Sequence, residues 1–329
     1  MPSTMTHTYF GIDVINKLPQ KYQYIIKDNK NNFKLFCQGP DPFMFYHFFV
    51  GKKALEGKEK QSNMHNKKTK SFFINTIKYI YEKKYNKHPQ IMSYLYGYIC
   101  HYYLDMYAHP YIYYKTGIFK KNDKSTYQYN GQHQKMEYII DLYMIEKREK
   151  TNPNTFKIHN NIFNITPFSK ELTSLINTTL EKTYNYHNTA KLYYKSSRYM
   201  KTFFRLFNYD PHGIKHKIYK TIDKITKDST INLEELSLHQ EYKTKLPYYL
   251  NTEHKKWYYP WNNKEHFTTS FQDLYNIALK EATTTIIQIT EMLENNTWNE
   301  ELLNNIFKDL SYVTGKPCNQ KLEMKYFEQ

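Results

Sequence analysis

The stretch Gly97-Tyr-Ile-Cys-His101-Tyr-Tyr-Leu-Asp105-Met-Tyr-Ala-His109 decides how the rest of the chain is interpreted. His101, Asp105 and His109 recur at intervals of four, and such residues share one face of an α-helix. The other residues are mostly Tyr, Leu, Ile and Met, so we expect the helix to be buried. Buried ionisable side chains are costly unless they are paired or bound to a metal. The stretch therefore predicts metal ligands on a core helix rather than a solvated polar face.

Imidazole and carboxylate are ligands that zinc commonly takes, so zinc is the expected metal. His133 and Glu137 show the same spacing of four. Such a pair alone is common on solvated helices, but beside the first helix it supplies a second half of the site. His7, Asp41 and His65 carry no such pattern. In isolation they indicate surface histidines and a turn aspartate before Pro42.

The composition favours a folded, helical protein. The chain has 329 residues, of which 40% are hydrophobic and 18% aromatic, with only 9 Gly. That content is too apolar for a disordered chain and has few of the breakers of a turn-rich β fold. We therefore expect an all-α fold with the metal site between helices.

The net charge of +16 has two interpretations. Such a charge attracts anionic phospholipid or nucleic acid. Lys, Asn, Ile and Tyr are also encoded by A/T-rich codons, so a biased genome would give the same excess. The lysines are spread along the chain, which favours the second interpretation.

The cysteines and the termini exclude other classes. Cys37, Cys100 and Cys318 are widely spaced and form no C-x-x-C, so neither a disulfide framework nor a cysteine zinc site is expected. The N-terminus lacks the apolar segment of a secretory signal, and no apolar run is long enough to span a membrane. A cytoplasmic location is the resulting expectation.

Apolar spacing and Pro/Gly positions predict the order of helices and loops. A break is expected at Pro19, and Pro110 is expected to end the central helix. The predicted helical ranges are 7–27, 62–84, 91–108, 132–150, 168–208, 214–227, 268–294 and 299–312, with loops at 51–60, 120–130 and 229–266.

Five short motifs occur in one order that resembles a known family. They are Thr6-His7-Thr8-Tyr9-Phe10-Gly11, the turn Gln38-Gly-Pro-Asp41-Pro-Phe-Met-Phe-Tyr46, Met64-His65, Cys100-His101-x-x-Leu-Asp105-x-x-x-His109-Pro110, and His133-x-x-x-Glu137. The order resembles the bacterial zinc-dependent phospholipase C family, including the phospholipase C/D domain of GPI-anchor-cleaving phospholipase D. It is distantly similar to fungal zinc nucleases that act on single strands. The resemblance covers roughly residues 5–150 and continues more weakly to about 205.

The resemblance implies an all-helical fold that holds two or three zinc ions. It assigns Asp41, His65, His101 and Asp105 to one zinc, Asp105 as a bridge to a second zinc at His7, and His109, His133 and Glu137 to a third. Asp41 occupies the position that is discussed in that family as a possible general base.

Two features of the sequence differ from the secreted members of that family. No Trp lies near the start to bind zinc through a free amino group, so water or another side chain would complete the zinc at His7. The interval of four residues between Asp105 and His109 is shorter than in the secreted enzymes and is similar to that of unsecreted relatives.

The resemblance implies zinc-dependent hydrolysis of phosphoester bonds, with a phospholipid as the first candidate substrate and possible contact with an anionic membrane. Nucleic acid or a nucleotide is the alternative substrate, and no protein partner is inferred. Two other classes stay open: a non-catalytic, zinc-stabilised helical protein, and a helical scaffold without metal. Phe43, Phe45, Tyr46 and Phe48 are expected either to line an apolar mouth or to pack in the core. The predicted organisation is a phospholipase C/D-like domain at 1–205 and a helical extension at 206–329 packed on the same core.

Overall fold

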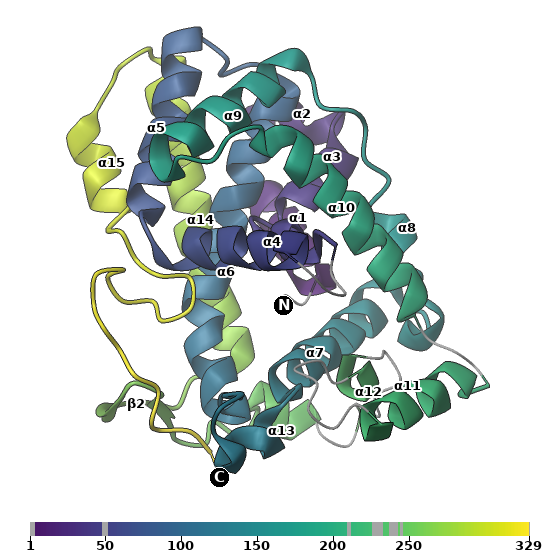
Figure 1. Cartoon of the computed structure of the whole chain (residues 1–329). Coiled ribbons are helices and arrows are strands. Elements are labelled where there is room, and N and C mark those ends of the chain that lie inside the picture. The colour runs from purple at the N-terminus through teal and green to yellow at the C-terminus, as the bar shows by residue number, and fades with distance from the viewer. Residues whose placement is uncertain are drawn as a thin grey trace.

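The computed structural model describes residues 4–47, 52–208, 212–225, 233–236, 243 and 246–328. Helices dominate this part of the chain, so the predicted all-α class is confirmed (Figure 1). The α-helices are α1 (Thr4–Lys17), α2 (Gln20–Lys27), α3 (Lys30–Phe36), α4 (Lys52–Asn66), α5 (Thr69–Lys83), α6 (Pro89–Thr116), α7 (Gln132–Glu149), α8 (Ile158–Ile162), α9 (Lys170–Tyr184), α10 (Thr189–Leu206), α11 (Ile214–Ile225), α12 (Leu233–Leu236), α13 (Leu246–Leu250), α14 (Phe271–Glu294) and α15 (Glu300–Ile306). Three short 3₁₀ helices are η1 (Asp41–Phe45), η2 (Lys124–Tyr129) and η3 (Pro153–Thr155). The strands β1 (Trp257–Tyr259) and β2 (Asn262–Phe267) form one antiparallel hairpin.

Helix α6 is the centre of the fold. It contacts α14 along its length and also packs against α3, α1 and α7. Figure 1 shows α14 lying beside α6. Its tyrosines are largely buried, and Tyr96 bonds its hydroxyl to that of Thr290 on α14 at 2.7 Å. Such bonds let an aromatic side chain with a polar tip lie inside the core.

The prediction that Pro110 ends the central helix is wrong. Helix α6 continues through Pro110 to Thr116. A proline inside a helix removes one backbone hydrogen bond, here to the carbonyl of Met106. Residues on both sides of Pro110 are buried, including Tyr111 and Ile112, and this packing holds the helix together past the missing bond.

The prediction of a Lys-rich loop over residues 51–60 is also wrong, because α4 begins at Lys52. Lys, Ala, Leu and Glu are all good helix formers, and this propensity outweighs the high charge. Ala54 is buried, and α4 packs against η1. The helix thereby carries His65 to the core at its C-terminal end.

Other boundaries follow the prediction more closely. Pro19 separates α1 from α2, and α7 fills nearly all of the range predicted for it. The range 168–208 is two helices rather than one, because Asn185 and Asn188 adopt positive φ values between α9 and α10. The range expected to be loop at 229–266 contains α12, α13 and the hairpin, and α15 is shorter than predicted.

The aromatic run after Asp41 packs inward. Phe43 contacts Tyr193 edge to face, and Phe45 contacts Phe203 in the same way. Both side chains are buried, which supports the expectation that they pack in the core rather than line the opening of the site. Tyr46 is half-buried, and Phe48 lies outside the described residues.

The C-terminal part of the chain returns to the central helices. Helix α14 packs on α6 and α1, and the backbone N–H of Tyr312 donates to the carbonyl of His65 at 2.9 Å. The division into units at 1–205 and 206–329 stays a prediction. Among the described residues, no helix has the length and apolar character needed to cross a membrane.

Candidate metal centre

Eight candidate side chains come together around residues 101–109 of the buried helix α6, which runs from Pro89 to Thr116. Helix α6 supplies His101, Asp105 and His109, and the remaining five come from α1, η1, α4 and α7. They form three adjoining groups in which the ligand atoms lie within 4.8 Å of one another: His7, His101 and Asp105; Asp41, His65 and His101; and His109, His133 and Glu137. The described residues therefore contain His/Asp/Glu groups able to bind metal.

Distances within the first two groups match those around a tetrahedral zinc ion. Ligands at about 2.0–2.2 Å from zinc lie roughly 3.4 Å from one another. The Nε2 atom of His65 lies 3.3 Å from a carboxylate oxygen of Asp41 and 3.3 Å from one of Asp105. The Nε2 atom of His101 lies 3.0 Å from Asp105 and 3.8 Å from Asp41.

The backbone orients the imidazole rings toward the centre of the groups. The Nδ1 atom of His65 lies 2.9 Å from the carbonyl of Gln61, and that of His101 lies 3.2 Å from the carbonyl of Cys37. Since a carbonyl only accepts, each Nδ1 must carry the proton. In the neutral form of each ring, Nε2 then presents a lone pair, as in metal-binding histidines whose tautomer a second group fixes.

The two carboxylate oxygens of Asp105 point toward different histidines. One oxygen lies near His65 and His101, and the other lies 3.0 Å from Nε2 of His7. The His7 ring stacks on that of His101, with centroids 4.4 Å apart. A carboxylate in this position can bridge two cations.

The third group lies one turn further along α6. The Nε2 atom of His133 lies 3.2 Å from Glu137, and that of His109 lies 3.7 Å from the same oxygen. The Nδ1 atom of His109 donates to the carbonyl of Tyr312 at 2.8 Å. Tyr312 thus belongs to the walls of two groups, because its ring also lies against those of His65 and His101.

The charge states suit a cation. Burial alone would raise the pKa of Asp105. The nearby imidazoles of His101, His109 and His7 have the larger, opposite effect and hold this pKa well below its usual range. Burial lowers the pKa of His101. A neutral His101 beside an ionised Asp105 is the combination that coordinates metal, whereas His109 must first lose a proton.

Several buried polar atoms of the groups make no hydrogen bond to the described residues. They are His7 Nδ1, Asp41 Oδ2, Asp105 Oδ2 and His133 Nδ1. Buried polar atoms are normally hydrogen-bonded. Their concentration among closely spaced carboxylates and imidazoles fits zinc, which has these residue types as its ordinary ligands.

A glycine lets the Asp41 turn approach the centre. Gly39 has a φ of +50°, and a Cβ atom at this position would overlap the ring of His101. The Gly39 carbonyl accepts from the hydroxyl of Tyr193 at 2.7 Å. Only glycine has both the left-handed conformation at low cost and the space needed here.

A small pocket of about 190 Å³ gives access to the groups. Asp41, His65, His109 and His133 face it, together with Tyr113 and the partly apolar wall of Met44 and Val313. Gln61 on its rim donates to Asp41 at 3.0 Å. Ser62, which also lines the pocket, is exposed, so the pocket reaches from the buried candidate ligands to the surface.

Gln61 and Tyr312 belong to no motif that the sequence analysis identified. Gln61 orients Asp41 through its side chain and His65 through its carbonyl, and Tyr312 orients His109 through its carbonyl. Any residue type can supply a backbone carbonyl, so composition and spacing carry no signal for that role.

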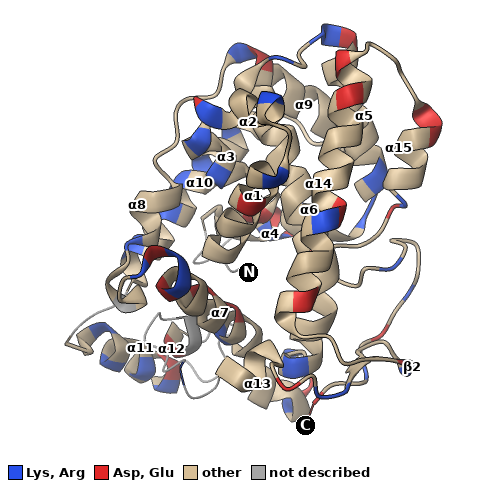
Figure 2. Ribbon diagram, turned by 180° about the vertical axis from the view of Figure 1, so that it is seen from behind, with Lys and Arg blue, Asp and Glu red and all other residues tan. Residues whose placement is uncertain are grey.

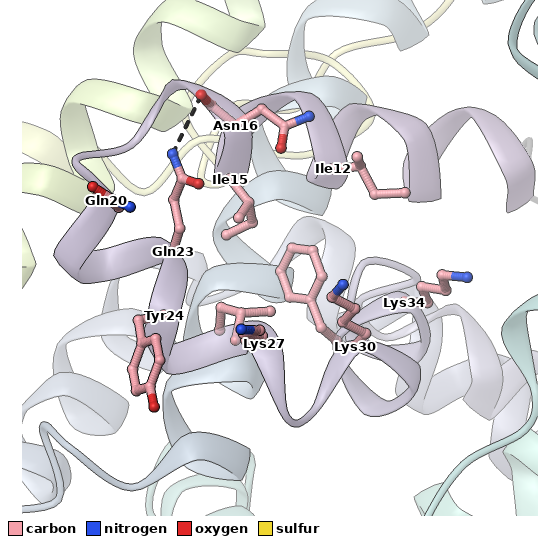
Figure 3. A pocket seen from close by; sticks show the side chains of 11 residues that line it. Ile12, Ile15, Asn16, Gln20, Gln23, Tyr24, Lys27, Lys30 and Lys34 are labelled. Carbon is pink, nitrogen blue, oxygen red and sulfur yellow. Dashed lines mark hydrogen bonds between the residues drawn. The ribbon is translucent and has the colours of Figure 1, made fainter.

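A second groove, of about 550 Å³, is separate from the candidate metal centre. It lies among α1, α2 and α3, and Figure 3 shows Ile12 and Ile15 of α1 on one side and Lys27 and Lys30 across from them. None of the eight candidate ligands lines it.

Comparison with known proteins supports the site's chemistry. A family model described as zinc dependent phospholipase C matches residues 6–190, a range that contains all eight candidate ligands. The searches of curated proteins and of solved structures found no significant match.

Proposed function

Because this chain belongs to the zinc-dependent phospholipase C family, we propose that it hydrolyses phosphodiester bonds of phospholipids in a phospholipase C/D-type reaction. The supporting observation is the pair of groups that share His101, with ligand spacings that match zinc and a pocket beside Asp41. A purely structural zinc site is closed, whereas a catalytic one keeps a position for water or substrate.

The proposed assignment of ligands uses the three groups. Asp41, His65, His101 and Asp105 would hold one zinc, Asp105 and His7 would hold a second, and His109, His133 and Glu137 would hold the third. The two-sided contacts of Asp105 support its role as the bridge.

The proposed chemistry divides between the metal and the chain. When bound by these residues, zinc would polarise the phosphoryl oxygens, lower the pKa of a water molecule and stabilise the leaving oxygen. Asp41 accepts a proton from the attacking water through its Oδ2 atom, while Gln61 holds the other oxygen at 3.0 Å. The water oxygen bonds to phosphorus as the bond to the leaving alcohol breaks, and the proton ends on that alcohol.

The pocket supports a headgroup phosphodiester as the reacting part of the substrate. Its volume of about 190 Å³ is below the range of roughly 300–1,000 Å³ that encloses a drug-sized ligand. The acyl chains of a phospholipid therefore stay outside the pocket, as they do when a lipid reacts from a bilayer.

The test is hydrolysis by the zinc-loaded protein. Phosphatidylcholine vesicles and single-stranded DNA are compared as substrates, and phosphorylated products are quantified. The proposal predicts release of a phosphate-containing product from the lipid and its loss in Asp41→Asn. Cleavage of DNA alone would assign the site to nucleic acid, and inactivity of a fully zinc-loaded protein on both would make the centre structural.

A further inference from the structure

Helix α11 presents an apolar face to solvent. Ile214, Ile218 and Ile225 lie at intervals of four and seven, which places them on one side of the helix. Their exposed fractions are 59%, 50% and 78%. Among the described residues, every exposed isoleucine except Ile277 lies on α11. A soluble surface rarely gathers large apolar side chains in this way without an interaction partner.

The other side of α11 attaches it to the protein. The Tyr219 ring stacks on that of Phe207 at 4.9 Å, and its hydroxyl donates to the carbonyl of Leu206 at 3.0 Å. Asp223 accepts from the backbone N–H groups of Leu233 and Glu234 at 2.9 and 2.7 Å. These contacts orient the helix so that the isoleucine face points away from the fold.

Basic residues border this face. Lys217, Lys220 and Lys224 follow one flank of the apolar stripe at helical spacing, and Lys220 also lies 3.7 Å from a carboxylate oxygen of Glu234. Figure 2 shows Lys and Arg, in blue, along both α10 and α11. A positive flank beside an exposed apolar stripe is complementary to an anionic, partly apolar partner.

A second set of cations lies where α8, α10 and α11 meet. Burial lowers the pKa of His159, and Lys201, Arg205, Lys157 and Lys215 lower it further. Four like charges close to one imidazole mark a strongly positive region that continues from α11. Such a region attracts the headgroups of anionic lipids.

We propose that α11 is a docking surface for an anionic phospholipid bilayer, with its isoleucines in the acyl boundary and its lysines on the headgroups. Nucleic acid would engage the lysines but leaves the isoleucine stripe unexplained. Helix α11 lies outside residues 6–190, so the surface is an addition to the segment shared with the family. The inference rests on the proposed function only in the choice of phospholipid as partner.

The test is co-sedimentation of the full chain with vesicles. Equimolar phosphatidylcholine and phosphatidylglycerol are compared with phosphatidylcholine alone. The variants are Ile214→Gln/Ile218→Gln for the apolar face and Lys217→Gln/Lys224→Gln for the charge. Since α11 has no buried residue, these changes leave the core intact, which circular dichroism checks. The matched controls are Ile277→Gln on α14 and Lys83→Gln/Lys87→Gln, all exposed and on other elements.

The wild type is expected to bind the anionic vesicles and to bind phosphatidylcholine vesicles at least about tenfold more weakly. Each α11 variant is expected to lose about tenfold or more in vesicle partitioning, and the controls to retain it. Wild-type binding by Ile214→Gln/Ile218→Gln, equal losses in the controls, or no wild-type binding would overturn the proposal.

A parallel assay separates this proposal from the proposed function. Hydrolysis of a short-chain phosphatidylcholine dissolved as monomers needs no docking, so Ile214→Gln/Ile218→Gln is expected to match the wild type. If the wild type binds vesicles through α11 but hydrolyses no phospholipid, docking stands and the proposed function falls. If the wild type hydrolyses the monomers but the α11 variants bind vesicles normally, the proposed function stands and docking through α11 falls.

Discussion

The Nε2 atoms of His65 and His101 face each other at 3.5 Å, although the Nδ1 atom of each ring already bonds to a backbone carbonyl. When both rings are neutral, two lone pairs therefore point at one another beside the carboxylates of Asp41 and Asp105. Without a cation this arrangement is repulsive, and with one it is a ligand set.

Replacing His101 is expected to lower metal content and stability together. His101 belongs to two of the three groups, so His101→Ala should lose about one zinc ion or more per chain. The free energy of unfolding should fall by about 2 kcal/mol or more, because buried carboxylates lose their partner. Elemental analysis and thermal unfolding measure the two effects. The exposed His187→Ala is the control, and unchanged zinc in His101→Ala would exclude the assignment.

Asp41→Asn is expected to reduce hydrolysis more than folding. The amide keeps the size of the side chain but is a poor proton acceptor, so the rate should fall about 100-fold or more. Initial rates on phosphatidylcholine and the melting temperature of the zinc-loaded protein give the comparison. Asp28→Asn, on an exposed turn, is the control. A variant as active as the wild type would remove Asp41 from the proposed role.

Gly39→Ala is expected to disturb the centre through a steric contact. Gly39 and Gly213 both have positive φ, at +50° and +65°, but only Gly39 lies against the His101 ring. Gly213→Ala should cost about 1 kcal/mol for the backbone alone. Gly39→Ala should cost more and also lower zinc content. Equal effects of the two substitutions on stability and zinc would show that the contact with His101 is unimportant.

Zinc binding is expected to release a proton from His109. Burial lowers the pKa of His109, but Asp105, Glu137 and the carbonyl of Tyr312 outweigh it and raise the pKa to about 9. In the metal-free protein this charge contributes stability below a pH of about 6.5, and the contribution is lost as pH rises through about 9. Zinc binding must displace the same proton. The affinity of the protein for zinc should therefore increase as the pH rises from about 6.5 to about 9.

Calorimetric zinc titrations in two buffers of different ionisation enthalpy measure the protons released. The wild type should release about one proton more per chain at neutral pH than His109→Gln. The affinity of the wild type should be higher at pH 8.5 than at pH 6.5. Equal proton release by both proteins would contradict the protonated state of His109.

Much of the fold and the ligand pattern could be predicted because it depends on helical spacing. His101, Asp105 and His109 are recognisable from intervals of four on an apolar helix, and α6 has that character. His7 and His65 have no local pattern and entered through the resemblance. The structure then placed them within reach of Asp105.

The failures have physical causes as well. Pro110 disfavours a helix locally, and tertiary packing overrides that preference. The start of α4 resembles a loop only in its high charge, and the helix propensity of its residues outweighs that charge. Tyr312 comes from a distant part of the chain and acts through its carbonyl. No pattern of residue types reveals a contact of that kind.

The most direct test of the central claim is elemental analysis of the purified, untagged protein after dialysis against metal-free buffer. Two or three zinc ions per chain are expected, and their removal by a chelator should lower the melting temperature. A protein that holds no zinc, even after zinc is added back, would contradict the metal centre and with it the proposed hydrolysis.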